Sequence, residues 1–402
     1  MTTESPSHNT KRDLKRDLSV LLSQDPSVVS RKMREEYDRL AGRRGDSIVL
    51  FGAGPVGRKA LACLRRAGLE PKTLADNNPS LWNTLVDGVS VLPPEDAVKR
   101  FGQDCAFVVT IYHGRAVREQ LRRLGCPAVI PFDCLFLKYS GSFLPHACLD
   151  LPDEIFLQSG LVEKAFDLWA DEQSRVEYVA QLKYRTSLDS RWTQAHDPAE
   201  DTYFPRDLAN LSDDEIFVDC GAFDGDTLRT FLKRCGGSFR QAIAIEADPA
   251  NFLGLQKYLR SLPPGIQEKV RAVNAAVGRI EQAVAFDATG TMGSRVVEGA
   301  GATQVPGDTL DRLLAGCARP YIKMDIEGAE LDALDGAKQT LATGSARLAI
   351  CAYHALDHLW RIPLTIDEVS CSCYDLYLRR YSEDCWENVC HAIPKGRRTE
   401  RS

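Results

Sequence analysis

Short apolar runs alternate with amphipathic stretches along the second half of the chain. We expect strands at the apolar runs near residues 216–219, 241–246, 270–274, 320–325 and 347–353. Alternation of such strands with helices is typical of a parallel α/β sheet. Two more apolar runs, 373–380 and 386–393, leave no room for a helix between them, so we expect an antiparallel hairpin at one edge. The pattern therefore predicts a seven-stranded sheet that ends in this hairpin.

The first half of the chain repeats this alternation on a smaller scale. We expect strands at 47–51, at a run that ends with 74–76, and at 106–111 and 128–130. A helical pattern follows the first of them and another follows the third, which is the order of a parallel sheet. The predicted fold class is therefore α/β, with two Rossmann-like domains.

Helical patterns lie on both sides of the first α/β unit. Leu14, Leu18, Leu21 and Leu22 form an apolar stripe that predicts a short helix packed on the domain after it. Residues 151–210 are mostly helical in pattern. The predicted segments are an amino-terminal helical extension (1–45), a Rossmann-like nucleotide-binding domain (46–140), a helical connector or lid (141–205) and a catalytic domain (206–402).

Composition and charge narrow the functional classes. The chain of 402 residues is 44% hydrophobic and 26% charged, with a net charge of −6, which argues against general affinity for nucleic acid or acidic membranes. No apolar run reaches the roughly 18 residues of a membrane span. The amino terminus is polar and lacks the apolar core of a secretory signal. Together with the odd number of thirteen cysteines, this favours a location in the reducing cytosol. We therefore expect a cytoplasmic protein, and homo-oligomerisation stays open.

The most informative motif follows the predicted strand at 216–219. The strand runs into Asp219, Gly221 and Gly225, and a helical pattern follows. Glycines let the backbone approach a nucleotide-like ligand at the carboxyl end of a parallel strand, and a carboxylate tolerates a cationic group where a phosphate would be repelled. Glu246 ends the next strand, where it can accept hydrogen bonds from ribose hydroxyls. Together these features predict a site for S-adenosylmethionine.

Four motifs make a resemblance to a known family specific. They are Val218-Asp-Cys-Gly-Ala-Phe-Asp-Gly-Asp-Thr227, Ile245-Glu-Ala-Asp-Pro-Ala-Asn-Phe252, Val273-Asn-Ala-Ala-Val-Gly278 and Ile322-Lys-Met-Asp-Ile-Glu-Gly-Ala-Glu330. In this order and spacing the carboxyl-terminal domain resembles the FkbM family of S-adenosylmethionine-dependent methyltransferases, over roughly residues 200–393. The resemblance implies a class I methyltransferase sheet and methyl transfer, usually to a hydroxyl on a sugar or secondary metabolite. The expected acceptor is thus a small molecule, nucleotide sugar or glycan.

The resemblance also implies which residues bind the cofactor. The expected set is Tyr203, Asp219, Gly221, Ala222, Asp224, Gly225, Thr227, Glu246, Ala247, Asn274, Ala275 and Asp325. Two positions depart from the family pattern, which commonly has Asn at the position of Phe223 and Pro at that of Ala247. The first departure removes a polar contact to the methionine portion, which Asp224 or Thr227 can supply. The second alters a turn.

The catalytic residues are expected after the fourth and fifth strands of the catalytic domain. Lys323, Asp325 and Glu327 alternate along the chain, so they would share one face of a strand. An alcohol acceptor has to lose its proton, and His354 is the preferred candidate for the general base, with Asp325 and Glu327 as alternatives. Asp325 and Glu327 could instead hold a divalent metal. Because no third ligand is evident, the sequence predicts no metal.

A second glycine motif lies in the first α/β unit. Gly52, Gly54 and Gly57 stand between a strand and a helix, and Asp76 follows about 20 residues later, as in dinucleotide-binding folds. The unit resembles the nucleotide-binding domains of sugar-modifying enzymes, which implies that it binds a nucleotide or nucleotide sugar. An NAD-dependent oxidoreductase, with Tyr112 and His113 as acid and base, is one alternative. A module retained only for packing or dimerisation is another.

Two other patterns suggest weaker interpretations. Cys371, Cys373, Cys385, Cys390 and His391 do not have a usual zinc spacing, and we expect them to be structural. The glycine-containing segments 289–293 and 299–303 predict flexible loops on the acceptor side.

Overall fold

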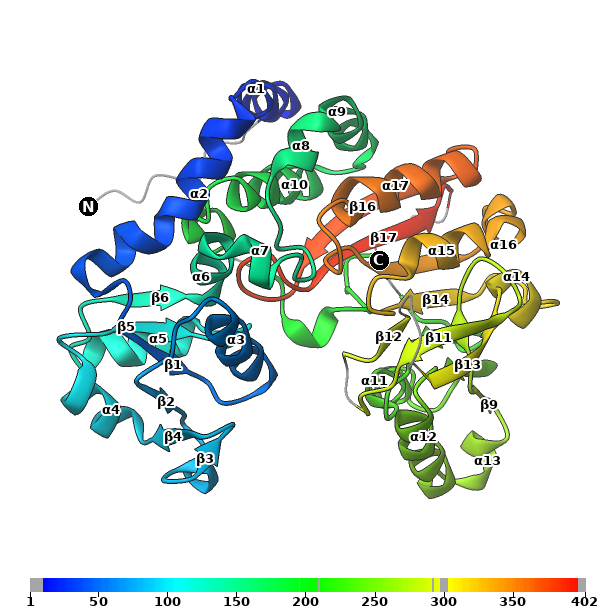
Figure 1. Ribbon diagram of the computed structural model, residues 1–402. Coiled ribbons are helices and arrows are strands. Elements are labelled where there is room, and N and C mark those ends of the chain that lie inside the picture. Colours follow the sequence, from blue (N-terminus) through cyan, green and yellow to red (C-terminus); the bar gives the residue numbers. More distant parts are fainter. Residues whose placement is uncertain (1–9, 195, 209, 291–292, 297–302, 397–402) are drawn as a thin grey trace, which may run out of the picture.

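A computed structural model describes residues 10–194, 196–208, 210–290, 293–296 and 303–396. Two large sheets lie in the two halves of the chain, with helices around each of them (Figure 1). The α/β class predicted from the sequence is confirmed. The sheets fall within the predicted segments 46–140 and 206–402, whose exact limits stay a prediction.

The carboxyl-terminal sheet has the strand order β16-β17-β15-β14-β7-β8-β9. Its strands are β7 (Ile216–Cys220), β8 (Gln241–Ile245), β9 (Val270–Val273), β14 (Tyr321–Met324), β15 (Arg347–Cys351), β16 (Tyr374–Arg380) and β17 (Asn388–Pro394). The first five pair in parallel, and β17 runs antiparallel to both β15 and β16. Every residue of β7 and β14 is buried, as expected for central strands covered on both faces.

Helices connect the strands of this sheet. They are α11 (Asp226–Arg234), α12 (Pro249–Ser261), α13 (Pro264–Gln267), α14 (Leu310–Leu313), α15 (Glu330–Asp335), α16 (Lys338–Ala342) and α17 (His358–Val369). Leu334, Leu359 and Trp360 pack with strand residues such as Ile322 and Ile350 in one apolar core. This core fixes the loops that follow the carboxyl ends of β7, β14 and β15.

A small sheet of order β10-β13-β11-β12 was not predicted. It contains β10 (Ala276–Val277), β11 (Ala283–Asp287), β12 (Arg295–Val296) and β13 (Thr303–Asp308). The sequence predicted loops at 289–293 and 299–303. Residues 291–292 and 299–302 lie outside the described residues, while Thr303 opens β13. Strand β11 is only partly buried and β12 is exposed, so they lack the apolar runs that identify the central strands.

The amino-terminal sheet has the order β3-β4-β2-β1-β5-β6. Its strands are β1 (Ile48–Phe51), β2 (Thr73–Ala75), β3 (Leu85–Val86), β4 (Val89–Leu92), β5 (Ala106–Val109) and β6 (Val129–Pro131), with helices α3 (Pro55–Arg66), α4 (Pro94–Phe101) and α5 (Arg115–Arg123). The sequence predicted β1, β2, β5 and β6. It missed the β3–β4 hairpin, which extends the sheet beyond β2, and it also missed α4.

Further helices surround and connect the two sheets. They are α1 (Lys11–Leu22), α2 (Pro26–Ala41), α6 (Phe132–Lys138), α7 (Ser140–Phe143), α8 (Asp153–Leu157), α9 (Ser159–Leu168) and α10 (Glu172–Arg185). The apolar stripe of α1 packs against α9 and α10, and Lys15 pairs with Asp167 at 2.5 Å. The prediction that α1 packs on the domain directly after it was therefore wrong. That position belongs to α2, which packs on α6.

The helices and the cysteines bear on two expectations from the sequence, the absence of a membrane span and the structural role of the carboxyl-terminal cysteines. None of the helices in the described ranges combines the length and apolar character that a membrane crossing requires. All thirteen cysteines are free, and most are buried. Cys385 and Cys390 belong to packed cores, and His391 hydrogen-bonds the Tyr381 hydroxyl at 3.0 Å. Within the described residues no metal-binding group includes these cysteines.

Candidate active site

A cavity of about 470 Å³ opens at the carboxyl ends of β7, β8 and β14. Gly221, Glu246 and Asp325 line it from the carboxyl-terminal sheet. Pro55 and Tyr112 line it from the amino-terminal half. The cavity is thus shared by both α/β units, and it contains most of the predicted site residues.

A buried ion pair supports the first loop of the cavity. Asp219 on β7 and Lys323 on β14 are register neighbours, with Lys323 Nζ 3.0 Å from Asp219 Oδ1. The ammonium also donates to the Gly221 carbonyl at 2.6 Å. Burial raises the pKa of Asp219 to about 6 against the opposing effect of Lys323. Burial alone would lower the pKa of Lys323, but the Asp219 charge outweighs it and raises that pKa.

The glycines of this loop are required by close packing. Gly221 has φ +77°, and a Cβ there would lie 1.9 Å from the Asp325 carbonyl oxygen. Gly225, at φ +90°, lies against the Tyr258 ring. The loop between β7 and α11 therefore lies directly on the loop after β14. This contact brings the predicted cofactor and catalytic segments together.

Glu246 holds the floor of the cavity in place. Its Oε2 accepts from the Phe223 amide and its Oε1 from the Asp248 amide, both at 2.8 Å. Asn274 donates to the Glu246 carbonyl at 2.8 Å and to the Ala247 carbonyl at 3.1 Å. Glu246 is 6% exposed, and burial raises its pKa. Glu246 and Asn274 thus connect the ends of β7, β8 and β9.

The other predicted cofactor residues differ in whether they line the cavity. Thr227, Ala247 and Ala275 line the cavity. Ala222 is fully buried. Asp224 is half exposed and pairs with Arg229, so it points away from the loop's buried side.

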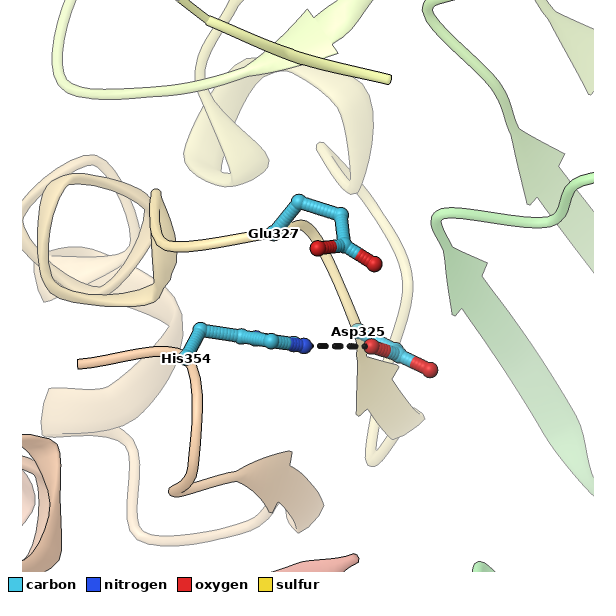
Figure 2. A group of neighbouring side chains, drawn as sticks. All are labelled: Asp325, Glu327 and His354. Atoms are coloured by element: carbon cyan, nitrogen blue, oxygen red, sulfur yellow. Dashed lines mark ion pairs between the residues drawn. The ribbon is translucent and has the colours of Figure 1, made fainter. Parts of the chain in front are cut away.

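The predicted catalytic residues converge after β14 and β15 (Figure 2). Asp325, Glu327 and His354 each offer a ligand atom, and these atoms all lie within 4.8 Å of one another. Strand β14 ends at Met324, so Asp325 and Glu327 do not continue the strand as predicted. They lie in the loop that follows, where Glu327 takes a left-handed φ of 54°.

His354 lies between two carboxylates. Its Nδ1 is 2.7 Å from Glu330 Oε1, and its Nε2 is 3.2 Å from Asp325 Oδ1. Burial alone would lower the pKa of His354, but the Glu330 charge and the Asp325 hydrogen bond raise it well above its usual value. Burial would raise the pKa of Asp325, yet its bonds to His354 and the Lys323 charge lower it.

Two more carboxyl groups face this region. Burial raises the pKa of Glu327 to about 7. Burial, followed by the charge of Asp325, raises the pKa of Glu387 to about 7. Both line the cavity, so its acceptor side is rich in carboxyl groups.

Sequence reasoning gave no role to Glu330 or Glu387. Glu330 is 0% exposed and binds both His354 and the Ile326 amide. Its spacing after Asp325 and Glu327 was visible, but its partner His354 is 24 residues away. Tyr203, predicted as a cofactor residue, donates to Asp325 Oδ2 at 2.7 Å and lines the cavity.

The amino-terminal glycine motif borders the same cavity. Gly57 packs on the Gly52 carbonyl, where a Cβ would lie at 1.8 Å, whereas a Cβ at Gly54 would meet nothing within 4 Å. Asp76 Oδ2 accepts from the Ala53 amide at 2.8 Å. Pro55, the next residue after Gly54, lines the cavity. The motif therefore forms a tight strand–helix turn whose open side lies beside the cavity.

Comparison with known proteins identifies the catalytic segment. Residues 219–362 match the methyltransferase FkbM domain. The chain contains an FkbM methyltransferase domain. The match spans the glycine loop, Glu246 and the Asp325–His354 region, so the FkbM domain includes most of the residues described above.

The fold agrees with this identification over nearly the whole chain. A methyltransferase FkbM structure from Methylobacillus flagellatus KT aligns with a TM-score of 0.73 and 21% identity, covering 96% of this chain and 99% of that chain. A precorrin-6y C5,15-methyltransferase from Geobacter metallireducens GS-15 gives a TM-score of 0.30 and 12% identity over 49% of this chain and 86% of that chain. A search of curated proteins finds no match. The FkbM domain and this fold support a methyltransferase.

A methyltransferase implies S-adenosylmethionine as methyl donor, and the cavity of the FkbM domain fits it. Apart from the ion pair between Oδ1 and Lys323, neither buried carboxylate oxygen of Asp219 has a hydrogen-bond partner among the described residues. Glu246 faces the cavity, where a carboxylate can accept from ribose hydroxyls. Ala275, Ala276 and Phe286 add apolar surface for a base. The donor set is therefore acidic and apolar, as a cationic nucleoside requires.

Proposed function

We propose that this protein is an S-adenosylmethionine-dependent O-methyltransferase that acts on a hydroxyl of a sugar, nucleotide sugar or related metabolite. The observation that carries the proposal is the shared cavity. Gly221 of the glycine loop and Glu246 line it, and so do Asp325, Glu327 and His354 of the cluster. A donor and an acceptor can therefore meet in it.

The chain's own residues would bind and orient the reactants. S-adenosylmethionine supplies an electrophilic methyl group on a sulfonium. Glu246 would hold the ribose, and Gly221 would let the loop backbone lie close to the methionine portion. Much of the rate enhancement in such a displacement comes from holding the acceptor in line with the methyl group.

The acceptor hydroxyl has to lose its proton during transfer. Asp325, Glu327 and His354 line the cavity together, and we assign proton removal to this cluster. His354 is held by Glu330 and Asp325, which fixes its ring relative to the cavity. Lys323 acts differently, because its ammonium is committed to Asp219 and the Gly221 carbonyl. We assign it a positioning role.

The amino-terminal unit would present the acceptor. Pro55, Tyr112 and His113 line the same cavity as Glu246 and Asp325. A nucleotide held beside Gly54 would place an attached sugar toward the methyl group. This arrangement supports a substrate-presenting role better than separate hydride chemistry, because the two α/β units share one cavity.

The test is product formation by the full chain. The protein is incubated with S-adenosylmethionine and a panel of sugars, nucleotide sugars and small alcohols, and S-adenosylhomocysteine is measured by mass spectrometry. We expect acceptor-dependent product that carries one added methyl group on oxygen. Methylation only of amine or thiol acceptors would overturn the O-methyl assignment. In a parallel incubation with NAD⁺, NADH formation without methyl transfer in the first would favour the oxidoreductase alternative.

A further inference from the structure

We propose that Asp325, Glu327 and His354 bind a divalent metal cation on the acceptor side of the cavity. The site of the proposed methyl transfer would then contain a cation as well as the donor. The role given to the cation below rests on the proposed function, but its binding does not.

The spacing of the three side chains suits a cation. Their ligand atoms lie within 4.8 Å of one another, and Asp325 Oδ1 is 3.2 Å from His354 Nε2. Two ligands that bind one cation at about 2.1 Å and at nearly right angles lie roughly 3 Å apart. Figure 2 shows Asp325 and Glu327 on one loop, with His354 reaching them from the loop after β15. The side chains are thus already gathered from two segments.

Hydrogen bonds behind the cluster orient two of the three ligands. Glu330 Oε1 accepts from His354 Nδ1 at 2.7 Å, which directs Nε2 toward Asp325. Tyr203 donates to Asp325 Oδ2 at 2.7 Å, which leaves Oδ1 on the side of His354. Metal-binding histidines usually donate their other nitrogen to a carboxylate, and metal-binding carboxylates are usually hydrogen-bonded in turn. These orienting hydrogen bonds support a metal site independently of the number of acidic groups in the cluster.

The local charge also favours a cation. Four carboxyl groups lie in this region, those of Asp325, Glu327, Glu330 and Glu387. Two cations act on them against the effect of burial. Lys323, which is paired with Asp219, lowers the pKa of Asp325, and the Arg295 charge lowers that of Glu327. In the metal-bound state His354 is neutral at Nε2, and a divalent charge offsets the carboxylates that surround it.

The donor set indicates the class of metal. Two carboxylates and one imidazole suit Mn²⁺ and related hard or borderline divalent ions better than soft ions such as Cu⁺. Three protein ligands leave coordination positions for water or an acceptor. Both Asp325 and Glu327 line the cavity, so these positions face the space where the acceptor would bind.

A cation there would act on the acceptor hydroxyl by lowering its pKa. In the overall reaction, the acceptor's O–H bond breaks and its proton passes to a carboxylate of this cluster, which releases it to solvent. The new O–CH₃ bond forms as the S–CH₃ bond breaks, and its electron pair stays on sulfur in neutral S-adenosylhomocysteine. No oxidant or reductant is needed.

The test is Mn²⁺ binding to the full-length protein after treatment with EDTA and removal of the chelator. Calorimetry and electron paramagnetic resonance should show one Mn²⁺ per chain, without added cofactor. Glu327→Gln should weaken the affinity at least tenfold, and Asp325→Asn should do the same. Glu268→Gln, which changes an exposed glutamate on the surface, should leave it unchanged. Thermal unfolding of each variant checks that it is folded.

The outcomes separate this proposal from the proposed function. Wild-type protein that binds no Mn²⁺, or binds it equally in folded Glu327→Gln or Asp325→Asn, overturns the metal site even if S-adenosylhomocysteine binds. Mn²⁺ binding without S-adenosylhomocysteine binding supports the site and contradicts the methyltransferase. With both present, EDTA should lower turnover at least tenfold and Mn²⁺ should restore it, with cofactor affinity changed less than threefold.

Discussion

At the scale of single residues, Gly221 decides whether the cofactor loop can adopt its conformation. Its φ of +77° is unfavourable for other residues, and a Cβ would overlap the Asp325 carbonyl oxygen at 1.9 Å. Gly221→Ala should therefore lower the free energy of unfolding by about 2–4 kcal/mol and weaken S-adenosylhomocysteine binding. Urea denaturation and calorimetric titration measure the two effects.

Gly254→Ala is the matched control. Gly254 lies inside α12, and the nearest atom to an added Cβ is the Asp224 Cβ at 3.7 Å. Alanine is the better helix former, so this change should raise the free energy of unfolding by up to about 1 kcal/mol. Equal effects of the two substitutions would show that the loop tolerates a side chain at Gly221.

The sequence was informative about residues whose role depends on local context. Gly221 and Glu246 follow buried strands, and this position alone placed them at the carboxyl edge of the sheet, where both line the cavity. Glu330 and Tyr203 were harder to interpret because their partners are distant in sequence: Tyr203 lies 122 residues from Asp325. The Glu330–His354 contact arises because the sheet order brings β14 and β15 together, whereas Tyr203 reaches Asp325 from the segment before β7.

At the scale of elements, a buried carboxyl joins α6 to α10. Asp133 on α6 accepts a hydrogen bond from the Tyr184 hydroxyl on α10. Burial, and then the charge of Asp384, raises the pKa of Asp133 to about 7. Because the folded state holds this proton more tightly than the unfolded state, stability should fall as pH rises from about 4 to 7.

Asp133→Asn should remove this fall in stability between pH 4 and pH 7. At pH 8 the variant should be more stable than the wild type by on the order of 2–4 kcal/mol, and at pH 4 the difference should shrink toward zero. Urea denaturation at both pH values tests this, with the exposed Asp213→Asn as control. A stability difference that does not change with pH would contradict the assignment.

Elements were predicted well where both faces of a strand are buried. The runs that became β7, β8 and β14 are nearly continuous in apolar residues. The helices α11 and α12, which follow β7 and β8, are long enough to show the helical spacing of apolar residues. The small sheet of β10 to β13 was missed because β12 is exposed and β11 is only partly buried. Strands of this kind are stabilised by their neighbours, which a single sequence does not reveal.

At the scale of the whole molecule, Trp386 joins the two α/β units. It lies in the loop between β16 and β17 and is 3% exposed. Its ring packs edge-on against Tyr112 at 4.8 Å and stacks on Phe132 at 6.0 Å. In Figure 1 this loop extends from the carboxyl-terminal sheet toward α6 and α7. The contact helps to hold the shared cavity together.

Trp386→Ala should lower the free energy of unfolding by about 3–5 kcal/mol and separate the unfolding of the two units. Urea denaturation followed by fluorescence and circular dichroism would show two transitions that no longer coincide. Trp192→Ala, at a residue 43% exposed, should cost less than about 1 kcal/mol. A single unshifted transition in Trp386→Ala would contradict a linking role.

The central claim is that the cavity of the FkbM domain binds S-adenosylmethionine. The most direct test is calorimetric titration of the full-length protein with S-adenosylhomocysteine, alongside Glu246→Ala and Asp219→Ala. We expect one binding site per chain with micromolar affinity, and at least tenfold weaker binding in both variants. Absence of S-adenosylhomocysteine binding in the wild type, or normal affinity in either variant, would contradict this assignment.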